Sequence, residues 1–173
     1  CGLPKERTYV TGSPMAEVLH NNLAEIEASD VHRRLCLEKG KYILLSAHRE
    51  ENIDTEKNFL SLFTAINKMA EKYDMPILYS CHPRSRNRLA ISSFQFDSRV
   101  IQHEPLGFHD YNCLQMNAFA VVSDSGTLPE ESSFFTSVGH PFPAVCIRTS
   151  TERPEAIDKG DFIIAGIDEK SLL

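Results

Sequence analysis

The sequence contains no Cys-x-x-Cys pair, although it has five cysteines in 173 residues. The cysteines are scattered and odd in number, at Cys1, Cys36, Cys81, Cys113 and Cys146. Most of them lie in apolar runs, where a free thiol behaves as a small hydrophobic group. The pattern argues against a disulfide framework or a zinc site, and it is typical of a protein from the reducing cytosol.

Several other signatures are missing. There is no GxxxxGK[ST] loop, no GxGxxG after the first predicted strand and no support for a Ser-His-Asp triad. The sequence therefore does not support a kinase, a P-loop protein or a dehydrogenase with the NAD-binding fingerprint. We also find no signal peptide and no apolar run long enough to span a membrane. The chain begins at Cys1 instead of Met and stops at Leu173, where a new helix opens. We therefore expect a fragment that is cut at both ends.

An excess of positive charge is also absent, because the formal net charge is −6. A nucleic-acid-binding surface normally needs a basic face, so we expect no nucleic acid and no membrane partner. A single nucleotide remains possible, since one or two arginines and a helix end can hold a diphosphate. The length, with 42% hydrophobic and 24% charged residues, fits one globular domain with a real core.

Short apolar runs alternate with helical patterns along the chain. The runs predict strands at residues 7–10, 41–46, 76–81, 100–101, 118–123, 142–147 and 162–164. The helical patterns cover residues 14–26, 30–38, 59–69, 84–93, 109–117, 127–137 and 153–159. Continuous apolar strands that alternate with helices predict a parallel sheet covered on both faces. We therefore expect residues 1–173 to form one doubly wound α/β domain.

Polar motifs follow four of the predicted strands directly. They are Ser46-Ala47-His48-Arg49, His82-Pro83-Arg84, Asp124-Ser125-Gly126 and Arg148-Thr149. In doubly wound sheets, ligands bind beyond the carboxyl ends of the strands. Four motifs on one edge support a binding site there better than any one of them alone.

The turn from Asp124 to Thr127 connects an apolar strand to an acidic helix start. Such a turn offers free backbone N–H groups to a phosphate, with Gly126 allowing close approach and Ser125 adding a hydroxyl. It could equally be a tight connection in which Thr127 and Glu130 form a capping box. Glu131, one turn into the helix, is a poor neighbour for phosphate and a good acceptor for a ribose diol.

The remaining candidates each have a structural alternative. His48 could be an ordinary loop histidine, or it could donate to a diphosphate or transfer a proton. A metal role is not expected, because no second histidine or cysteine lies three or four residues away. Arg148 and Arg153 form a surface ion-pair cluster or a phosphate clamp. Tyr111 is core or a platform for a base. For His82-Pro83-Arg84 we favour a rigid turn.

In combination these motifs resemble the bacterial non-hydrolysing UDP-N-acetylglucosamine 2-epimerases. The resemblance covers essentially the whole chain, in the family's order and spacing. It is carried by Thr11-Gly12-Ser13-Pro14, Ala47-His48-Arg49-Glu50-Glu51-Asn52, His82-Pro83, Pro105-Leu106, Asp124-Ser125-Gly126 with Glu130-Glu131, and Thr151-Glu152-Arg153-Pro154-Glu155.

The resemblance implies two Rossmann-like domains arranged as in B-type glycosyltransferases, of which this chain matches the C-terminal one. That domain holds UDP without a cofactor or a metal. The resemblance implies roles for six residues: His48 near the diphosphate and active site, Tyr111 beside uracil, Ser125 and Gly126 on phosphate, Glu131 on ribose, and Arg148 lining the cleft. We also expect Arg153 to bind UDP. The acid and base carboxylates belong to the other domain, so we expect this chain alone to be inactive.

The sequence departs from the common family pattern at three positions. Glu50 stands where many members have a second arginine, and Thr127 and Pro129 replace the usual Gly and Gln. Relatives act on other UDP-N-acetylhexosamines during capsule or O-antigen synthesis, including the step to UDP-N-acetyl-L-fucosamine, and such substrates stay open. A non-catalytic nucleotide-sugar-binding module is the second class of hypothesis. A glycosyltransferase is the third, and the Thr151–Glu155 element argues against it by resemblance.

Overall fold

A single six-stranded parallel sheet forms the centre of the protein. The computed structural model describes residues 4–9, 11–49, 52, 55–81, 83–148 and 162–173. The strands are β1 (Ile43–Ser46), β2 (Ile77–Ser80), β3 (Val100–His103), β4 (Ala120–Ser123), β5 (Ala144–Ile147) and β6 (Ile163–Ala165). Their spatial order is β3-β2-β1-β4-β5-β6, and every pairing is parallel. This confirms six of the predicted strands and the doubly wound α/β class.

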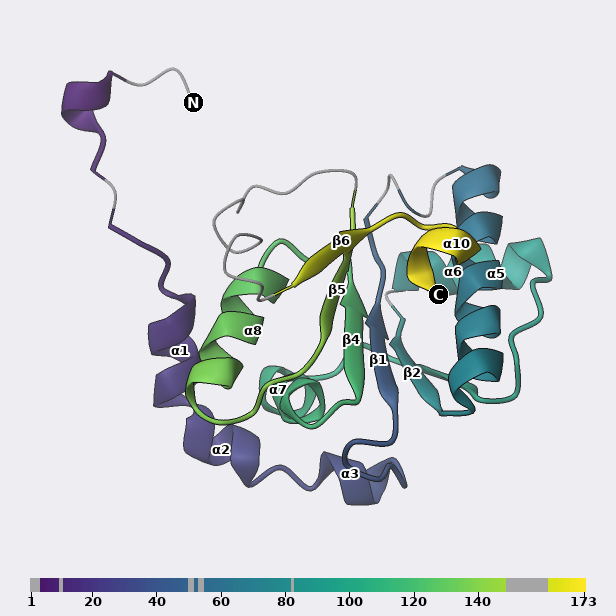
Figure 1. Cartoon of the computed structure of the whole chain (residues 1–173), viewed down its shortest axis with the longest axis horizontal. Coiled ribbons are helices and arrows are strands. Elements are labelled where there is room, and N and C mark those ends of the chain that lie inside the picture. Colours follow the sequence, from purple (N-terminus) through teal and green to yellow (C-terminus); the bar gives the residue numbers. More distant parts are fainter. Residues whose placement is uncertain (1–3, 10, 50–51, 53–54, 82, 149–161) are drawn as a thin grey trace.

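Helices cover both faces of the sheet (Figure 1). One face carries α5 (Glu56–Tyr73), α6 (Pro83–Ser92) and α10 (Glu169–Leu172), and the other carries α1 (Met15–Asn21), α2 (Leu23–Glu27), α3 (Val31–Arg34), α7 (Phe108–Met116) and α8 (Leu128–Ser137). The helices between consecutive parallel strands are the crossovers that such a sheet requires.

The buried strands supply side chains to two separate cores. Along β1, Ile43 and Leu45 belong to the cluster beneath α5, whereas Leu44 belongs to the cluster beneath α7 and α8. This alternation follows from the two-residue period of a strand, and it explains why Ile43, Leu44 and Leu45 are all apolar. Both faces of the central strands are therefore covered by packed side chains.

Three local predictions near the N-terminus are wrong. The expected strand at 7–10 is not formed in its described part, because Arg7 ends a 3₁₀ turn, η1 (Lys5–Arg7), and Thr8 and Tyr9 belong to no strand. The predicted helix 14–26 is divided at Asn22 into α1 and α2. The helix expected at 30–38 ends at Arg34. Tyr9 is 83% exposed, and no strand among the described residues pairs with Thr8 or Tyr9. The predicted helix at 153–159 lies outside the described residues.

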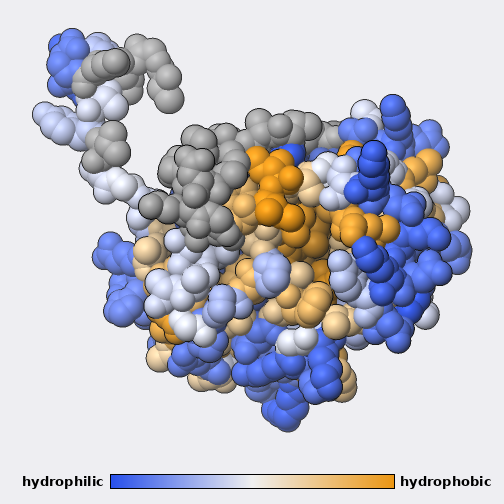
Figure 2. All heavy atoms as spheres, in the orientation of Figure 1, coloured by the Kyte–Doolittle hydropathy of each residue, from blue (hydrophilic) through white to orange (hydrophobic). Residues whose placement is uncertain are grey.

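The sheet ends at β6, which pairs only with β5 within the described chain. Figure 2 shows hydrophobic surface where β6 lies in Figure 1, and Ile163 on this strand is 63% exposed. No helix among the described residues is long and apolar enough to cross a membrane.

Candidate functional site

The strand order reverses between β1 and β4, and two of the predicted motifs meet at this point. β1 is followed in space by β2 and β3 on one side, and β4 by β5 and β6 on the other. Ser46 and Ser123 are register partners at the carboxyl ends of these strands, and the N–H of Asp124 donates to the carbonyl of Ser46 at 3.1 Å. The reversal of strand order opens a crevice beyond such strand ends, which is where ligands of these folds bind.

A completely buried carboxylate links the two motifs. Oδ2 of Asp124 accepts the backbone N–H groups of His48 at 2.9 Å and Arg49 at 2.8 Å. It also accepts Nδ2 of Asn52 at 3.1 Å. The second oxygen, Oδ1, lies 3.1 Å from Nδ1 of the half-exposed His48 ring. A buried carboxylate needs several donors of this kind, so the loop after β1 is fastened to the end of β4.

Two further side chains extend these contacts. The guanidinium Nε of Arg49 donates to the backbone carbonyl of Asp124 at 2.8 Å. The amide of Asn52, 5% exposed, also donates to the carbonyl of Ile147 at the end of β5, at 3.1 Å. The motif after β1 is therefore connected to the ends of two other strands. Sequence reasoning gave Asp124 and Asn52 no role of their own, although a carboxylate straight after an apolar strand is a signal of a buried, partnered charge.

The capping box considered for α8 is not formed. Thr127 occupies the N-cap of α8 without a side-chain capping bond, and Glu130 instead accepts the hydroxyl of Ser13 at 2.5 Å. The Thr127 hydroxyl is used elsewhere, since it donates to Glu131 Oε1 at 2.7 Å and lies 2.9 Å from Ser125 Oγ. The side chain of Thr127 therefore does not cap the first turn of this ten-residue helix, in which Pro129 has no N–H group. This arrangement favours the anion-binding interpretation of the glycine turn.

Gly126 occupies this turn for a reason other than backbone strain. Among the described glycines, positive φ is found at Gly12, Gly40 and Gly139 and not at Gly126. A residue with a side chain could therefore adopt the backbone angles of Gly126. The absence of a side chain at Gly126 leaves the backbone at the N-terminus of α8 open to close approach.

Each carboxylate oxygen of Glu131 accepts a hydrogen bond from a neighbouring side chain. Oε1 accepts the Thr127 hydroxyl, and Oε2 accepts Nε2 of the fully buried Gln115 at 2.8 Å. Each carboxylate oxygen has a second lone pair, so two protein contacts leave acceptor capacity for a diol. The side chain is half-buried and its direction is fixed by α7 and α8, which suits a group that positions a ligand.

Tyr111 lies beneath the crevice and packs against the core between α7 and the sheet. Burial raises the pKa of its hydroxyl, and the nearby charge of Glu131 acts in the same direction. Interactions of the hydroxyl with Ser46 and Ser123 oppose that shift. Tyr111 thus reaches the same strand ends as the predicted site, with its ring largely within the protein.

The charged groups of the edge converge around Cys146 on β5. Burial raises the pKa of this thiol, the charges of Arg148 and Arg49 act to lower it, and the charge of Asp124 adds to the increase. Arg148 is 8% exposed and directly follows β5, and its charge acts on the same thiol as that of Asp124. His48, Ser125, Gly126, Glu131 and Arg148 are therefore brought to one edge. Arg153 and His82 lie outside the described residues.

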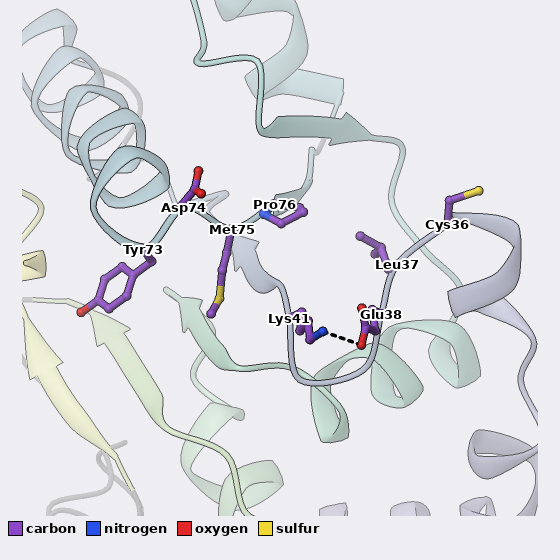
Figure 3. A pocket seen from close by; sticks show the side chains of 8 residues that line it. All are labelled: Cys36, Leu37, Glu38, Lys41, Tyr73, Asp74, Met75 and Pro76. Atoms are coloured by element: carbon purple, nitrogen blue, oxygen red, sulfur yellow. Dashed lines mark ion pairs between the residues drawn. The ribbon is translucent and has the colours of Figure 1, made fainter.

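A separate cavity lies at the opposite edge of the sheet. About 460 Å³ in volume, it lies at the amino ends of β1 and β2, with Lys41 and Glu38 paired across its rim at 2.8 Å (Figure 3). Figure 3 shows Tyr73, Met75 and Pro76 at its wall. Within the described ranges, no cluster of three or more His, Cys, Asp or Glu side chains could hold a metal ion. The described groups suit an anionic organic ligand at the carboxyl edge.

A parallel sheet of order 3-2-1-4-5-6 with helices on both faces defines a Rossmann-like α/β domain. A model of the UDP-N-acetylglucosamine 2-epimerase family matches residues 1–173, and the chain belongs to this family. This confirms the resemblance carried by the sequence motifs.

Individual relatives agree with this assignment. The chain is 30% identical to the UDP-N-acetylglucosamine 2-epimerase of Methanococcus maripaludis, covering 99% of this chain and 48% of the relative. The epimerase of Methanocaldococcus jannaschii in complex with UDP-GlcNAc and UDP superposes with a TM-score of 0.85 at 27% identity, over 99% of this chain and 47% of that one. For the epimerase of Rickettsia bellii the TM-score is 0.81 at 32% identity, over 99% and 45%.

The chain thus spans about half the length of the curated relatives that it matches, and it corresponds to their C-terminal half. The Escherichia coli ADP-heptose heptosyltransferase II superposes with a TM-score of 0.50 at 11% identity, a likeness of fold alone. That likeness agrees with the expected relation to B-type glycosyltransferases.

Proposed function

We propose that this chain is the UDP-binding half of a UDP-N-acetylglucosamine 2-epimerase. The observation that carries the proposal is the uncapped N-terminus of α8, beside the Ser125-Gly126 turn and the buried cation of Arg148. A helix N-terminus and an arginine are the two devices that bind a phosphate most strongly. The M. jannaschii relative with UDP-GlcNAc and UDP bound supports the choice of nucleotide.

In this proposal each part of the ligand meets one group of the edge. The diphosphate lies on Ser125, Gly126 and Arg148, with Arg153 as a further clamp. The ribose diol donates to Glu131, and His48 stands beside the reacting end of the diphosphate. Tyr111 is proposed to border the uracil, with its ring edge instead of an open face because the ring is largely enclosed.

The proposed reaction needs a good leaving group, and this half provides for it. A proton is removed from C2 of the sugar while the C1–O bond breaks and its electron pair leaves with UDP, giving 2-acetamidoglucal. Re-addition of UDP, with a proton delivered to the other face of C2, inverts that carbon. Cations and N–H groups at the diphosphate stabilise the charge that develops on UDP. The carboxylates that move the proton are proposed to belong to the other half of the enzyme.

The wider setting is part of the same proposal. We propose a cytoplasmic enzyme that works as a homodimer with its N-terminal domain attached, in capsule or O-antigen sugar synthesis. The free thiols of Cys36, Cys81, Cys113 and Cys146 are compatible with a reducing compartment. Another UDP-N-acetylhexosamine, such as the precursor of UDP-N-acetyl-L-fucosamine, is the alternative substrate.

Calorimetry of the 173-residue chain with UDP and UMP tests the binding role. We expect UDP to bind about tenfold or more tightly than UMP, because the β-phosphate gains charge-assisted hydrogen bonds worth about 1.5–3 kcal/mol. No detectable heat and no rise in melting temperature at millimolar UDP would refute the site. The isolated chain should give no epimerase turnover, and turnover by the pure chain would show that its own residues suffice for catalysis.

A further inference from the structure

The two carboxylate oxygens of Asp124 have different neighbours. Oδ2 accepts three N–H groups, from the backbone of His48 and Arg49 and from the amide of Asn52. These contacts fasten the loop after β1. Oδ1 takes no part in them, and it lies 3.1 Å from Nδ1 of the His48 ring. A loop anchor would need only the first oxygen, so the second contact has a separate consequence.

We propose that Asp124 is a positioning residue, which holds the His48 ring through Nδ1 and so presents Nε2 to the ligand at this edge. The proposal rests on the function proposed above only for the identity of that ligand. His48 is 48% exposed in its side chain, whereas Asp124 is fully buried. The carboxylate is therefore the fixed partner and the ring is the group that it orients.

The proximity of the two atoms also favours one position for the hydrogen of the imidazole. Oδ1 of Asp124 is buried and has no hydrogen-bond partner among the described residues, and Nδ1 of His48 lies 3.1 Å from it. Because a carboxylate oxygen only accepts, the neutral ring is stabilised beside it when Nδ1 carries the hydrogen. In the neutral ring Nε2 is then an acceptor, able to take a proton or to receive a hydrogen bond from the ligand. The described charges near this edge are those of Asp124, Arg49, Arg148 and Glu131, and Asp124 contacts the ring.

A second histidine provides an internal reference of opposite tautomer. Tyr42 donates its hydroxyl hydrogen to the carbonyl of Leu114, so the hydroxyl oxygen, 2.9 Å from Nε2 of His32, accepts from that nitrogen. Neutral His32 therefore carries its hydrogen on Nε2, and Nδ1 faces the thiol of Cys113 at 3.8 Å. The same chain thus contains one histidine expected in each tautomeric form.

The test is the tautomer of His48 in the ligand-free chain with ¹⁵N-labelled histidine. Long-range ¹H–¹⁵N correlation at a pH where the rings are neutral should show Nδ1–H for His48 and Nε2–H for His32. His48→Gln identifies the His48 signals by their loss. Finding Nε2–H at His48 in the unmodified chain would overturn the proposal, whether or not any variant folds.

Asp124→Asn then separates positioning from anchoring. The asparagine Oδ1 can still accept the backbone N–H groups, but its amide now presents a donor to His48 Nδ1. We expect the His48 tautomer to invert to Nε2–H, the His32 signals to stay unchanged, and UDP to bind about tenfold more weakly. An unchanged His48 tautomer in the folded variant would contradict the proposal. If the tautomers are as expected and UDP fails to bind the unmodified chain, the proposed function fails while the positioning role stands.

Discussion

At the carboxyl edge of the sheet, Asp124 is fully buried and Arg148 is 8% exposed, and Asp124 accepts hydrogen bonds from backbone N–H groups. At the amino edge, Lys41 pairs with Glu38 with both side chains more than 60% exposed, and the other pairs of this edge also face solvent at least in part. Both edges belong to the same apolar strands. The charges of the carboxyl edge, where we propose the ligand site, are therefore buried and preorganised, whereas those of the amino edge form exposed or partly exposed pairs.

The largest contrast between the edges is expected in stability. Asp124→Ala leaves two backbone N–H groups without their acceptor, so the free energy of unfolding should fall by about 3 kcal/mol. Glu38→Ala removes an exposed pair at the other edge and should cost about 0.5 kcal/mol or less. Urea denaturation of the two variants measures both values. Equal losses would mean that the carboxyl edge is not specially organised.

A second contrast concerns affinity for UDP. Arg148→Ala should weaken UDP binding by about 1.5–3 kcal/mol, because a charge-assisted contact to phosphate is lost. Arg33→Ala is the matched control, since Arg33 is 82% exposed and pairs with Asp30 on α3, away from the carboxyl edge. Calorimetric titration with UDP compares them. If both substitutions weaken binding alike, the effect is one of net charge and Arg148 is no clamp.

His32 should make the stability pH-dependent near neutrality. Burial lowers its pKa from the usual 6.5, with the charge of Lys39 adding to the shift, so the folded state disfavours the charged ring. Stability is then complete above pH 6.5 and is lost as the pH falls below 6.5 towards the lowered pKa. His32→Gln should flatten this dependence in denaturation curves at successive pH values. An identical pH profile in the variant would contradict it.

Asp97 at the amino edge should affect the stability of the protein only in strong acid. This is the smallest of the expected effects. Hydrogen bonds from the Arg99 side chain and backbone lower the pKa of its carboxyl from 3.8 to about 2. The stabilisation is complete above pH 3.8 and is lost as the pH falls through about 2. Asp97→Asn should remove this part of the acid dependence and leave UDP binding unchanged. Melting temperatures between pH 2 and 5 measure it.

The strands and the binding edge could be predicted because they follow from local patterns. Apolar runs such as 76–81 must be buried, and polar residues straight after them must lie at one edge. The failures have a different cause. Thr8 and Tyr9 have strand-forming side chains but find no neighbouring strand, and Asn22 interrupts a helix that the apolar spacing makes continuous. Tertiary context decides such segments.

Within the site, residue types could be predicted but their partners could not. Thr127 and Glu130 have the spacing of a capping box, yet Glu130 accepts from Ser13, which is 117 residues away. The three donors to Asp124 lie 72 to 76 residues from it in the chain. No local pattern encodes contacts at such separations.

The adjacency of β1 and β4 also has a consequence for how the molecule forms. Because the loop after β1 is fastened by a residue that follows β4, the nucleotide site cannot exist while the chain is only partly folded. Closing such long loops is slow relative to forming helices. A ligand that binds only the fully folded edge does not bind partly folded chains. It therefore shifts the folding equilibrium towards the native state. UDP added during refolding should thus raise the yield of native chain, although it contacts only the carboxyl edge of the sheet.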